Sequence, residues 1–197
     1  MFDFLRKLFY GTIKCIVFLF FPVVWIYNRF FTNAVNEVIG FYWKSQIKNK
    51  GKDLRIHGRI NVLVPNRLEI GDYCRIGKGA FLFCYGGLKI GNNVQFSRNI
   101  TIYTANHDFK NDVLPYNDKY LVGPVTIGNN VWLGMNVSIL PNVSIGDNVI
   151  IGMNAVITKN IPDNAIVVGN NRIVGYRPDE QIKKSEGRYF GKIFSNM

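Results

Sequence analysis

Aliphatic and small residues recur every six positions along much of the chain. From residue 127 to residue 162 the sequence reads as six consecutive blocks, IGNNVW, LGMNVS, ILPNVS, IGDNVI, IGMNAV and ITKNIP. Each block opens with Ile or Leu and carries Val, Ala or Ile four positions later. Neither a helix nor an alternating strand has a period of six, so this segment is an internal repeat, and the repeat determines the architecture.

The repeat predicts a parallel β-helix in which each block forms one short strand and one corner, and three blocks complete a coil. The aliphatic residue points into a dry interior, the fifth-position residue fits the narrow corner, and the Gly-Asn pairs supply turn conformations. The spacing extends back to Val64, with two extra residues around 84–87 and a thirteen-residue excursion at 108–120. We therefore expect an all-β domain of about four to five coils over residues 54–178, in which each coil depends on its neighbours.

Residues 1–50 differ in character from the repeat domain. The twenty residues from Leu8 to Tyr27 contain one charge, Lys14, and are crowded with aromatic side chains. No small-residue cleavage site follows them, so a cleaved signal peptide is not expected. The length allows a membrane-spanning helix, but Lys14 and Pro22 favour a helical segment that associates with the membrane surface or re-enters it through residues 1–45. The alternative is a hydrophobic helix that packs on the β-helix or on another subunit.

The charge balance indicates an anionic partner. The net charge is +11, from 24 Lys and Arg against 13 Asp and Glu, and a basic tail occupies residues 179–197. Nucleic acid, a membrane surface or a phosphorylated small molecule could provide the negative charge. No helix-turn-helix, zinc-finger or RNA-recognition motif accompanies it, so nucleic acid is not expected. Three irregularly spaced cysteines do not form a disulfide framework and indicate a cytoplasmic location.

His107 is the candidate for catalysis. It is one of two histidines and stands at a corner of the repeat, immediately before the long excursion. Long loops on a rigid solenoid commonly carry function, and an imidazole there can act as a general base near neutral pH. A zinc site of the γ-carbonic-anhydrase type needs three histidines, which His57 and His107 cannot supply, so no metal is expected.

Several motifs occur together: TANHDF before the excursion, GPVTIGNNVWLG after it, and TKNIPDNAIVVGN ahead of the basic tail. In this combination the chain resembles the acetyl-CoA-dependent hexapeptide acyltransferases, which include galactoside and maltose acetyltransferases and O-acetyltransferases of surface polysaccharides. The resemblance covers roughly residues 64–178. It implies a left-handed parallel β-helix, acetyl-CoA as the acyl donor, and a homotrimer whose active sites lie between subunits.

The resemblance also implies roles for individual residues. His107 would deprotonate the acceptor hydroxyl, and a backbone amide at Gly134 or Met135 would stabilise the oxyanion. Acceptor binding would fall to Tyr85 and Asp108, and the Tyr85 hydroxyl could orient His107. The residues expected to contact the cofactor are Trp132, Gly134, Met135, Met153, Thr158, Lys159 and Arg172.

The leading hypothesis is an O-acetyltransferase that modifies a sugar hydroxyl of a surface glycan, such as capsule, O-antigen or exopolysaccharide. The apolar N-terminal segment would bring it to a lipid-linked acceptor at the inner face of the cytoplasmic membrane. One alternative is an acetyltransferase for a small soluble acceptor, either a sugar or an antibiotic. Another is a non-catalytic β-helix scaffold, which would show no thioester turnover and no CoA-dependent thermal shift.

Overall fold

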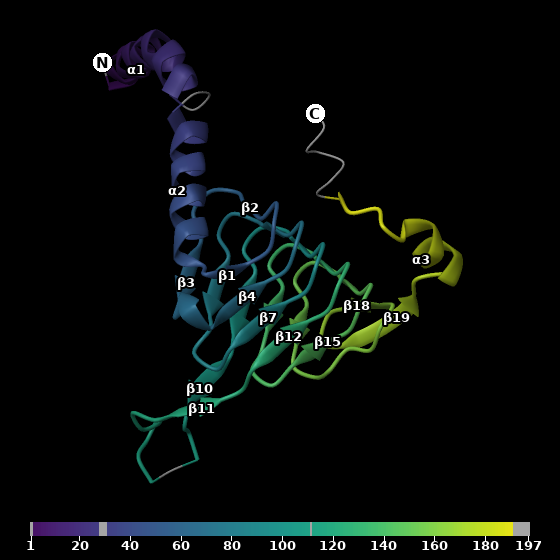
Figure 1. The fold of residues 1–197 in the computed structure, drawn as a ribbon. Coiled ribbons are helices and arrows are strands. Elements are labelled where there is room, and N and C mark those ends of the chain that lie inside the picture. Colours follow the sequence, from purple (N-terminus) through teal and green to yellow (C-terminus); the bar gives the residue numbers. More distant parts are fainter. Residues whose placement is uncertain (1, 28–30, 111, 191–197) are drawn as a thin grey trace.

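The strands stack as a three-sided parallel solenoid in the computed structural model, which describes residues 2–27, 31–110 and 112–190 (Figure 1). Sheet A consists in order of β1 (Asn49–Lys50), β4 (Leu68–Ile70), β7 (Leu88–Ile90), β12 (Val125–Ile127) and β15 (Ser144–Ile145). Sheet B consists of β2 (Arg55–Ile56), β5 (Arg75–Ile76), β8 (Gln95–Phe96), β13 (Trp132–Leu133), β16 (Ile150–Ile151), β18 (Ala165–Val168) and β19 (Arg172–Tyr176). Sheet C consists of β3 (Asn61–Leu63), β6 (Phe81–Phe83), β9 (Thr101–Tyr103), β14 (Ser138–Ile139) and β17 (Val156–Ile157). Three corners join these sheets, and we call them the A–B, B–C and C–A edges.

The predicted β-helix is confirmed as a parallel solenoid, but the predicted number of coils is too low. The described residues form five complete coils and the start of a sixth, in which Ile161 bridges to Ile145 before β18. The additional coil consists of β1 to β3, so the solenoid begins at Asn49 rather than at residue 54. The sequence pattern missed this coil because its last inward residue is Val62, whereas Val64 takes a left-handed turn conformation with φ 60°.

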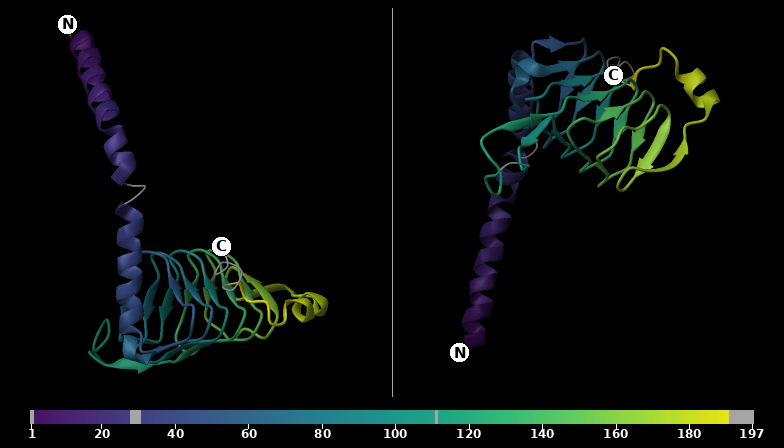
Figure 2. Two further views of the ribbon diagram at one scale, coloured as in Figure 1. Left: turned by 45° about the horizontal axis from the view of Figure 1, so that its top comes forward. Right: turned by 90° about the horizontal axis from the view of Figure 1, so that it is seen from below.

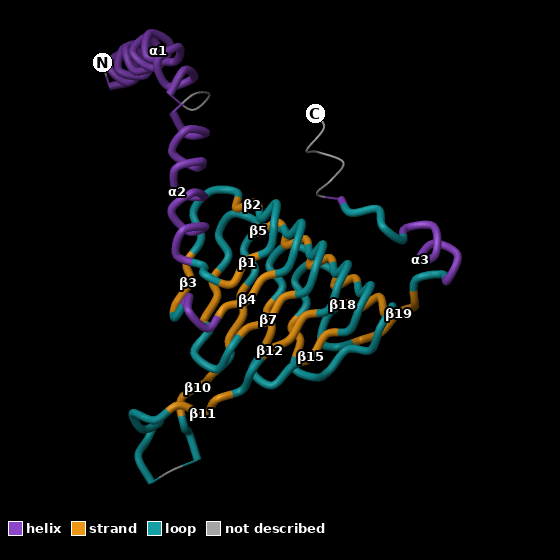
Figure 3. Tube along the Cα trace, viewed as in Figure 1, coloured by secondary structure: helices purple, strands orange, loops and turns teal. Residues whose placement is uncertain are grey.

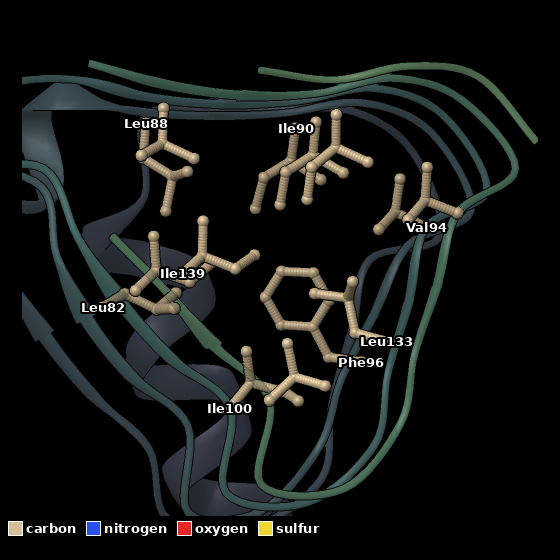
Figure 4. Close-up of a cluster of buried hydrophobic side chains, with 14 of the residues drawn as sticks. Leu82, Leu88, Ile90, Val94, Phe96, Ile100, Leu133 and Ile139 are labelled. Atoms are coloured by element: carbon tan, nitrogen blue, oxygen red, sulfur yellow. The ribbon is translucent and has the colours of Figure 1, made fainter. Parts of the chain in front are cut away.

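The interior is filled by two residues from each block. The aliphatic residue that opens a block and the residue at its fifth position are both buried, as the repeat predicted. Figure 4 shows the interior across several stacked coils, where Leu88, Ile90, Val94, Phe96 and Ile100 of the third coil point toward the centre. Burying each aliphatic side chain contributes about 1.5–3 kcal/mol, and no coil can bury its residues without the coils on either side.

Asparagines in left-handed conformation turn the chain at the A–B edge. Asn130 has φ 56°, and its side chain lies in a row of amides that runs along the solenoid. Asn93 donates to Asn130 (2.9 Å), Asn130 to Asn148 (3.0 Å), and Asn148 to Asn164 (3.0 Å). A short polar side chain is needed here, because it tolerates positive φ and continues the row.

The C–A edge carries the irregularities of the solenoid. The 3-10 helix Pro65–Arg67 lies at this edge in the first coil, and the extra residues predicted at 84–87 lie there in the second. The third coil places the long excursion at the same edge, between β9 and β12. Extra residues are accommodated at a corner because the strands on either side must keep their register with the neighbouring coils.

Among the described residues, helices α1 and α2 precede the solenoid and helix α3 follows it (Figure 3). Helix α2 (Thr32–Gln46) packs over the first coil, where Gly40 lies so close to the Ile56 carbonyl that a Cβ would stand 2.8 Å from its oxygen. Helix α1 (Phe2–Ile26) projects away from the solenoid (Figure 2). Its stretch Phe9–Ile26, with mean hydropathy 1.9, has the length and composition to cross a membrane, and none of it is buried.

The basic tail includes a short helix and returns along the solenoid. Helix α3 (Asp179–Ser185) follows the β18–β19 hairpin. Beyond it, the Tyr189 ring stacks on Tyr73 with 5.1 Å between the ring centres, and the Phe190 N–H donates to the Asn93 side chain (3.0 Å). The tail therefore reaches from the last coil back to the second and third.

We expect Asn130→Ala to destabilise the solenoid more than Asn130→Gly. Both substitutions remove the amide row at this corner, at about 0.5–1.5 kcal/mol per hydrogen bond, but only alanine must also adopt positive φ, at about 1–2 kcal/mol. Denaturant unfolding followed by circular dichroism measures the difference. Equal losses of unfolding free energy in the two variants would show that the positive φ of Asn130 does not affect stability.

Candidate active site

His107 lies at the neck of the excursion. It ends β10 (Ala105–His107), which pairs antiparallel with β11 (Tyr120–Val122), and His107 stands opposite Tyr120. These two strands carry the loop away from the C–A edge (Figure 1). The position predicted for His107, at a corner directly before the loop, is the one that the structure shows.

The imidazole is held between tyrosines. Its ring stacks on Tyr116 with 4.0 Å between ring centres, and it lies tilted against Tyr120 with 4.6 Å between ring centres. The Nδ1 atom is buried and has no hydrogen-bond partner among the described residues. Buried polar atoms are almost always hydrogen-bonded, so this atom marks a place where a bound molecule or another subunit would supply a partner.

Tyr85 supports this arrangement without touching His107. Its ring lies 5.1 Å from that of Tyr120 and 5.2 Å from the Arg67 guanidinium, and its carbonyl accepts a hydrogen bond from the same guanidinium. No hydrogen bond joins the Tyr85 hydroxyl to His107 in the part of the chain that the structure describes. Tyr85 therefore acts on His107 through Tyr120, and its contact with an acceptor stays a prediction.

Asp108 closes the loop. Its carboxylate accepts hydrogen bonds from the Lys110 N–H (3.0 Å) and the Asn117 side chain (3.5 Å), and its N–H donates to the Lys119 carbonyl (3.0 Å). These contacts give Asp108 a structural role at the neck. Asp108 was also predicted to bind the acceptor. Its carboxylate would have to do so while it already accepts hydrogen bonds from two partners.

Thr104 fixes the start of β10 and was missed by the sequence reasoning. It is a fully buried polar residue, and its Oγ1 donates to the Phe83 carbonyl (2.7 Å) and accepts from the Gly86 N–H (2.7 Å). Gly86 has no room for a side chain, since a Cβ would stand 1.9 Å from the Thr104 carbonyl oxygen. The sequence held one sign of this role. A threonine stands two residues after Ile102, at the position that Cys84 occupies in the coil below.

Part of the predicted donor site lies along the B–C edge. Met135 and Met153 occupy equivalent corners of successive coils, and Met153 is 61% exposed. Trp132, on sheet B, is 51% exposed, and its indole N–H donates to Ser97 (3.3 Å).

The Gly134 N–H is not available for an oxyanion, because it donates to the Ile151 carbonyl (2.7 Å). Of the two predicted amides, that of Met135 is the one without a partner among the described residues.

The remaining predicted donor residues lie elsewhere. Thr158 and Lys159 form the C–A corner of the fifth coil, where the Asn171 side chain accepts from both N–H groups and donates to the Thr158 hydroxyl (2.8, 3.2 and 2.8 Å). Lys159 and Arg172 are exposed. Asn171, which no motif indicated, thus holds this corner against the β18–β19 hairpin.

Within one chain the predicted site residues do not converge. Met135 and Met153 stand on the B–C edge, His107 on the C–A edge, and the whole of sheet C separates the two edges. The described residues contain no group of three His, Cys, Asp or Glu side chains that could hold a metal ion. The arrangement offers a base at one edge and an exposed apolar row with an unpaired amide at another.

The comparison with known proteins identifies the same six-residue repeat. Residues 124–159 match the model of the family described as bacterial transferase hexapeptide, six repeats. The chain is 29% identical over 124 residues to an Escherichia coli acetyltransferase, WcaF, assigned provisionally to colanic acid biosynthesis, which covers 63% of this chain and 66% of that one. It is 37% identical over 107 residues to the galactoside O-acetyltransferase of Escherichia coli, covering 54% and 50%. The chain thus matches about two thirds or less of the length of these relatives.

Solved structures show the same fold. A maltose O-acetyltransferase from Clostridium difficile superimposes with a TM-score of 0.60 at 25% identity, covering 77% of this chain and 91% of that one. A hexapeptide-repeat acetyltransferase from Vibrio cholerae, complexed with acetyl coenzyme A, gives 0.62 at 20% identity, covering 74% and 88%. Repeat and fold together define a β-solenoid of the hexapeptide-repeat type. In its repeat and in its fold the chain is similar to the hexapeptide-repeat acetyltransferases.

We expect Thr104→Val to destabilise the protein by about 1–3 kcal/mol, because it leaves the Gly86 N–H and the Phe83 carbonyl without their side-chain partner. Thr104→Ser keeps the hydroxyl, and we expect it to lower the free energy of unfolding much less. Urea unfolding of both variants measures the difference. A valine variant as stable as the serine variant would contradict a role for the hydroxyl.

Proposed function

We propose that the protein is an acetyl-CoA-dependent O-acetyltransferase that acts on a sugar hydroxyl, with His107 as the general base. The observation that carries this proposal is the His107 imidazole, held by two tyrosines at the neck of the loop with a buried, unpartnered Nδ1. A ring fixed in this way is oriented before substrate arrives, as general-base catalysis requires.

The chemistry follows from the groups present. His107 takes the proton of the acceptor hydroxyl while the hydroxyl oxygen attacks the thioester carbonyl. The carbonyl oxygen becomes negatively charged and is stabilised by the free N–H of Met135. When the carbon–sulfur bond breaks, the imidazolium returns the proton to the departing thiolate, so His107 ends as it began.

The donor fits the exposed row on the B–C edge. Met135, Met153 and Trp132 offer an apolar surface along which an extended pantetheine arm can lie, beside the free Met135 amide. Lys159 and Arg172 are exposed cations suited to the phosphates of coenzyme A. Because Lys159 stands at the C–A corner, it would have to come from a second copy of the chain to meet a donor on the B–C edge. Thr158 is already bonded to Asn171, so its part in donor binding would be limited to shaping this corner.

A complete site would need a second copy of the chain. The base and the donor row stand on different edges of one solenoid, so they can face each other only between subunits. This separation supports a homotrimer with three inter-subunit sites. It also offers a source for the missing partner of His107 Nδ1.

The acceptor is proposed to be a surface glycan or its lipid-linked precursor. Two features support this: a relative assigned to colanic acid biosynthesis and the exposed apolar helix α1. Helix α1 has 25 residues, about 38 Å at 1.5 Å per residue, whereas a bilayer core is about 30 Å thick. Residues 1–45 would hold the enzyme at the inner face of the cytoplasmic membrane. A soluble sugar acceptor is the second candidate, supported by the galactoside O-acetyltransferase relative.

His107→Ala is expected to lower kcat for acetyl transfer by about 10²–10⁴-fold, because it removes the group proposed to take the hydroxyl proton. Release of free coenzyme A measures the rate, and light scattering tests whether the oligomer is retained. Lys89→Ala, an exposed change on sheet A, serves as the control. Undiminished turnover in an intact His107→Ala oligomer would rule out this mechanism.

Removal of residues 2–31 separates the two acceptor classes. The truncation stops before Thr32 because α2 packs on the first coil and is part of the solenoid. For a membrane-linked acceptor we expect loss of membrane co-sedimentation and of glycan acetylation, with turnover of a soluble galactoside unchanged. Full glycan acetylation by the truncated protein would instead favour the soluble acceptor.

A further inference from the structure

One row of side chains runs along the B–C edge from the second coil to the fifth and changes chemistry halfway. Lys78, Arg98, Met135 and Met153 occupy the same corner position in four successive coils, following Gly77, Ser97, Gly134 and Gly152. The ladder at this corner confirms the register: Asn99 donates to the Lys78 carbonyl and Asn136 to the Arg98 carbonyl. The row is therefore cationic in the second and third coils and carries thioethers in the fourth and fifth.

The cationic half lies between two grooves that α2 helps to form. A groove of ≈ 630 Å³ lies on one side and includes Asn36 and Glu37 of α2 among its lining residues. A groove of ≈ 820 Å³ lies on the other side and includes Trp43 of α2. Lys78, Arg98 and Met135 line both grooves. A ligand in either groove would contact both cations and the residue beside which the acetyl donor is proposed to lie.

The two cations are exposed and lie close together. Neither forms an ion pair among the residues that the structure describes, and Glu37 is the acidic residue in the lining of the grooves, whereas Arg59 and Arg75 add positive charge. Successive coils are about 4.8 Å apart, so Lys78 and Arg98 repel each other. An anion bound between them would remove this repulsion.

His57, which lines the smaller groove, adds no charge. Burial and the neighbouring Arg75 and Arg55 lower the pKa of His57 below its ordinary value, and its Nε2 accepts a hydrogen bond from Arg75 (2.8 Å). It is therefore neutral at neutral pH. Anion binding at this end of the edge depends on the lysine and the arginines.

We propose that Lys78 and Arg98 bind the diphosphate of an activated sugar acceptor, at the end of the B–C edge next to the donor row. The inference rests on the proposed function for the sugar, while the anion site rests on the cations themselves. Arg98 can hold two phosphate oxygens with its planar guanidinium, and Lys78 contributes a point charge one coil away. The diphosphate could come from a polyprenyl diphosphate in the membrane or from a nucleotide sugar. Helix α2 contributes to both grooves and packs on the end of the solenoid from which α1 projects, which suits the lipid.

The test is direct binding to the full-length protein in detergent. Inorganic diphosphate is titrated by calorimetry into the wild type, into the double variant Lys78→Gln/Arg98→Gln, and into the matched control Lys48→Gln/Lys89→Gln, which loses the same charge elsewhere. We expect the Kd for diphosphate to rise at least tenfold in the Lys78/Arg98 variant and to stay within twofold in the control. Absence of binding by the wild type, or equal weakening in both variants, would overturn the proposal.

Competition then identifies the source of the diphosphate. Displacement by a polyprenyl diphosphate, or by uridine diphosphate, supports the site and assigns the acceptor class, and displacement by neither contradicts it. Because binding is measured without turnover, the result is independent of His107. If the protein binds diphosphate but transfers no acetyl group, the proposed function is wrong and the proposed anion site is still supported.

Discussion

The structure depends on the stacking of one coil on the next. Strands of two or three residues cannot persist alone, and each coil satisfies its backbone groups and buries its aliphatic residues only against its neighbours. The same constraint sets the side-chain chemistry of the surface, because a corner residue always lies beside the corresponding residues of the adjacent coils. Rows along the edges, such as the asparagine amides at the A–B edge, are a direct result.

Stacking also explains why the three edges of the solenoid carry different features. Strands must stay in register, so extra residues can enter only at corners, and here they gather at the C–A edge. That edge holds the aromatic neck with His107, and Thr104 ties the neck to the coil below. The B–C edge has no insertion in its middle coils and presents a continuous row that changes from cationic to apolar. A base on one edge and a binding row on another explain why one solenoid alone does not form a site.

Helix α2 connects the solenoid to the apolar N-terminal helix. It packs on the first coil through the close approach of Gly40 to Ile56, and its other residues line the grooves beside Lys78 and Arg98. The end of the solenoid that α2 covers therefore also carries Lys78 and Arg98, which form no ion pair among the described residues.

The sequence by itself determined the fold class, the buried rows, the loop and the position of His107, because the six-residue period maps each residue onto a face or a corner. It did not reveal the first coil, where Val64 has the right spacing but forms a turn. Only the tertiary structure decided the partners: Thr104 with Gly86, Asn171 with Thr158, and Tyr116 with His107. It also decided that the Gly134 amide is occupied, whereas that of Met135 has no partner in the part of the chain that the structure describes. The repeat specifies which corner a residue occupies, but hydrogen bonds and ring contacts depend on coils and loops far away in the chain.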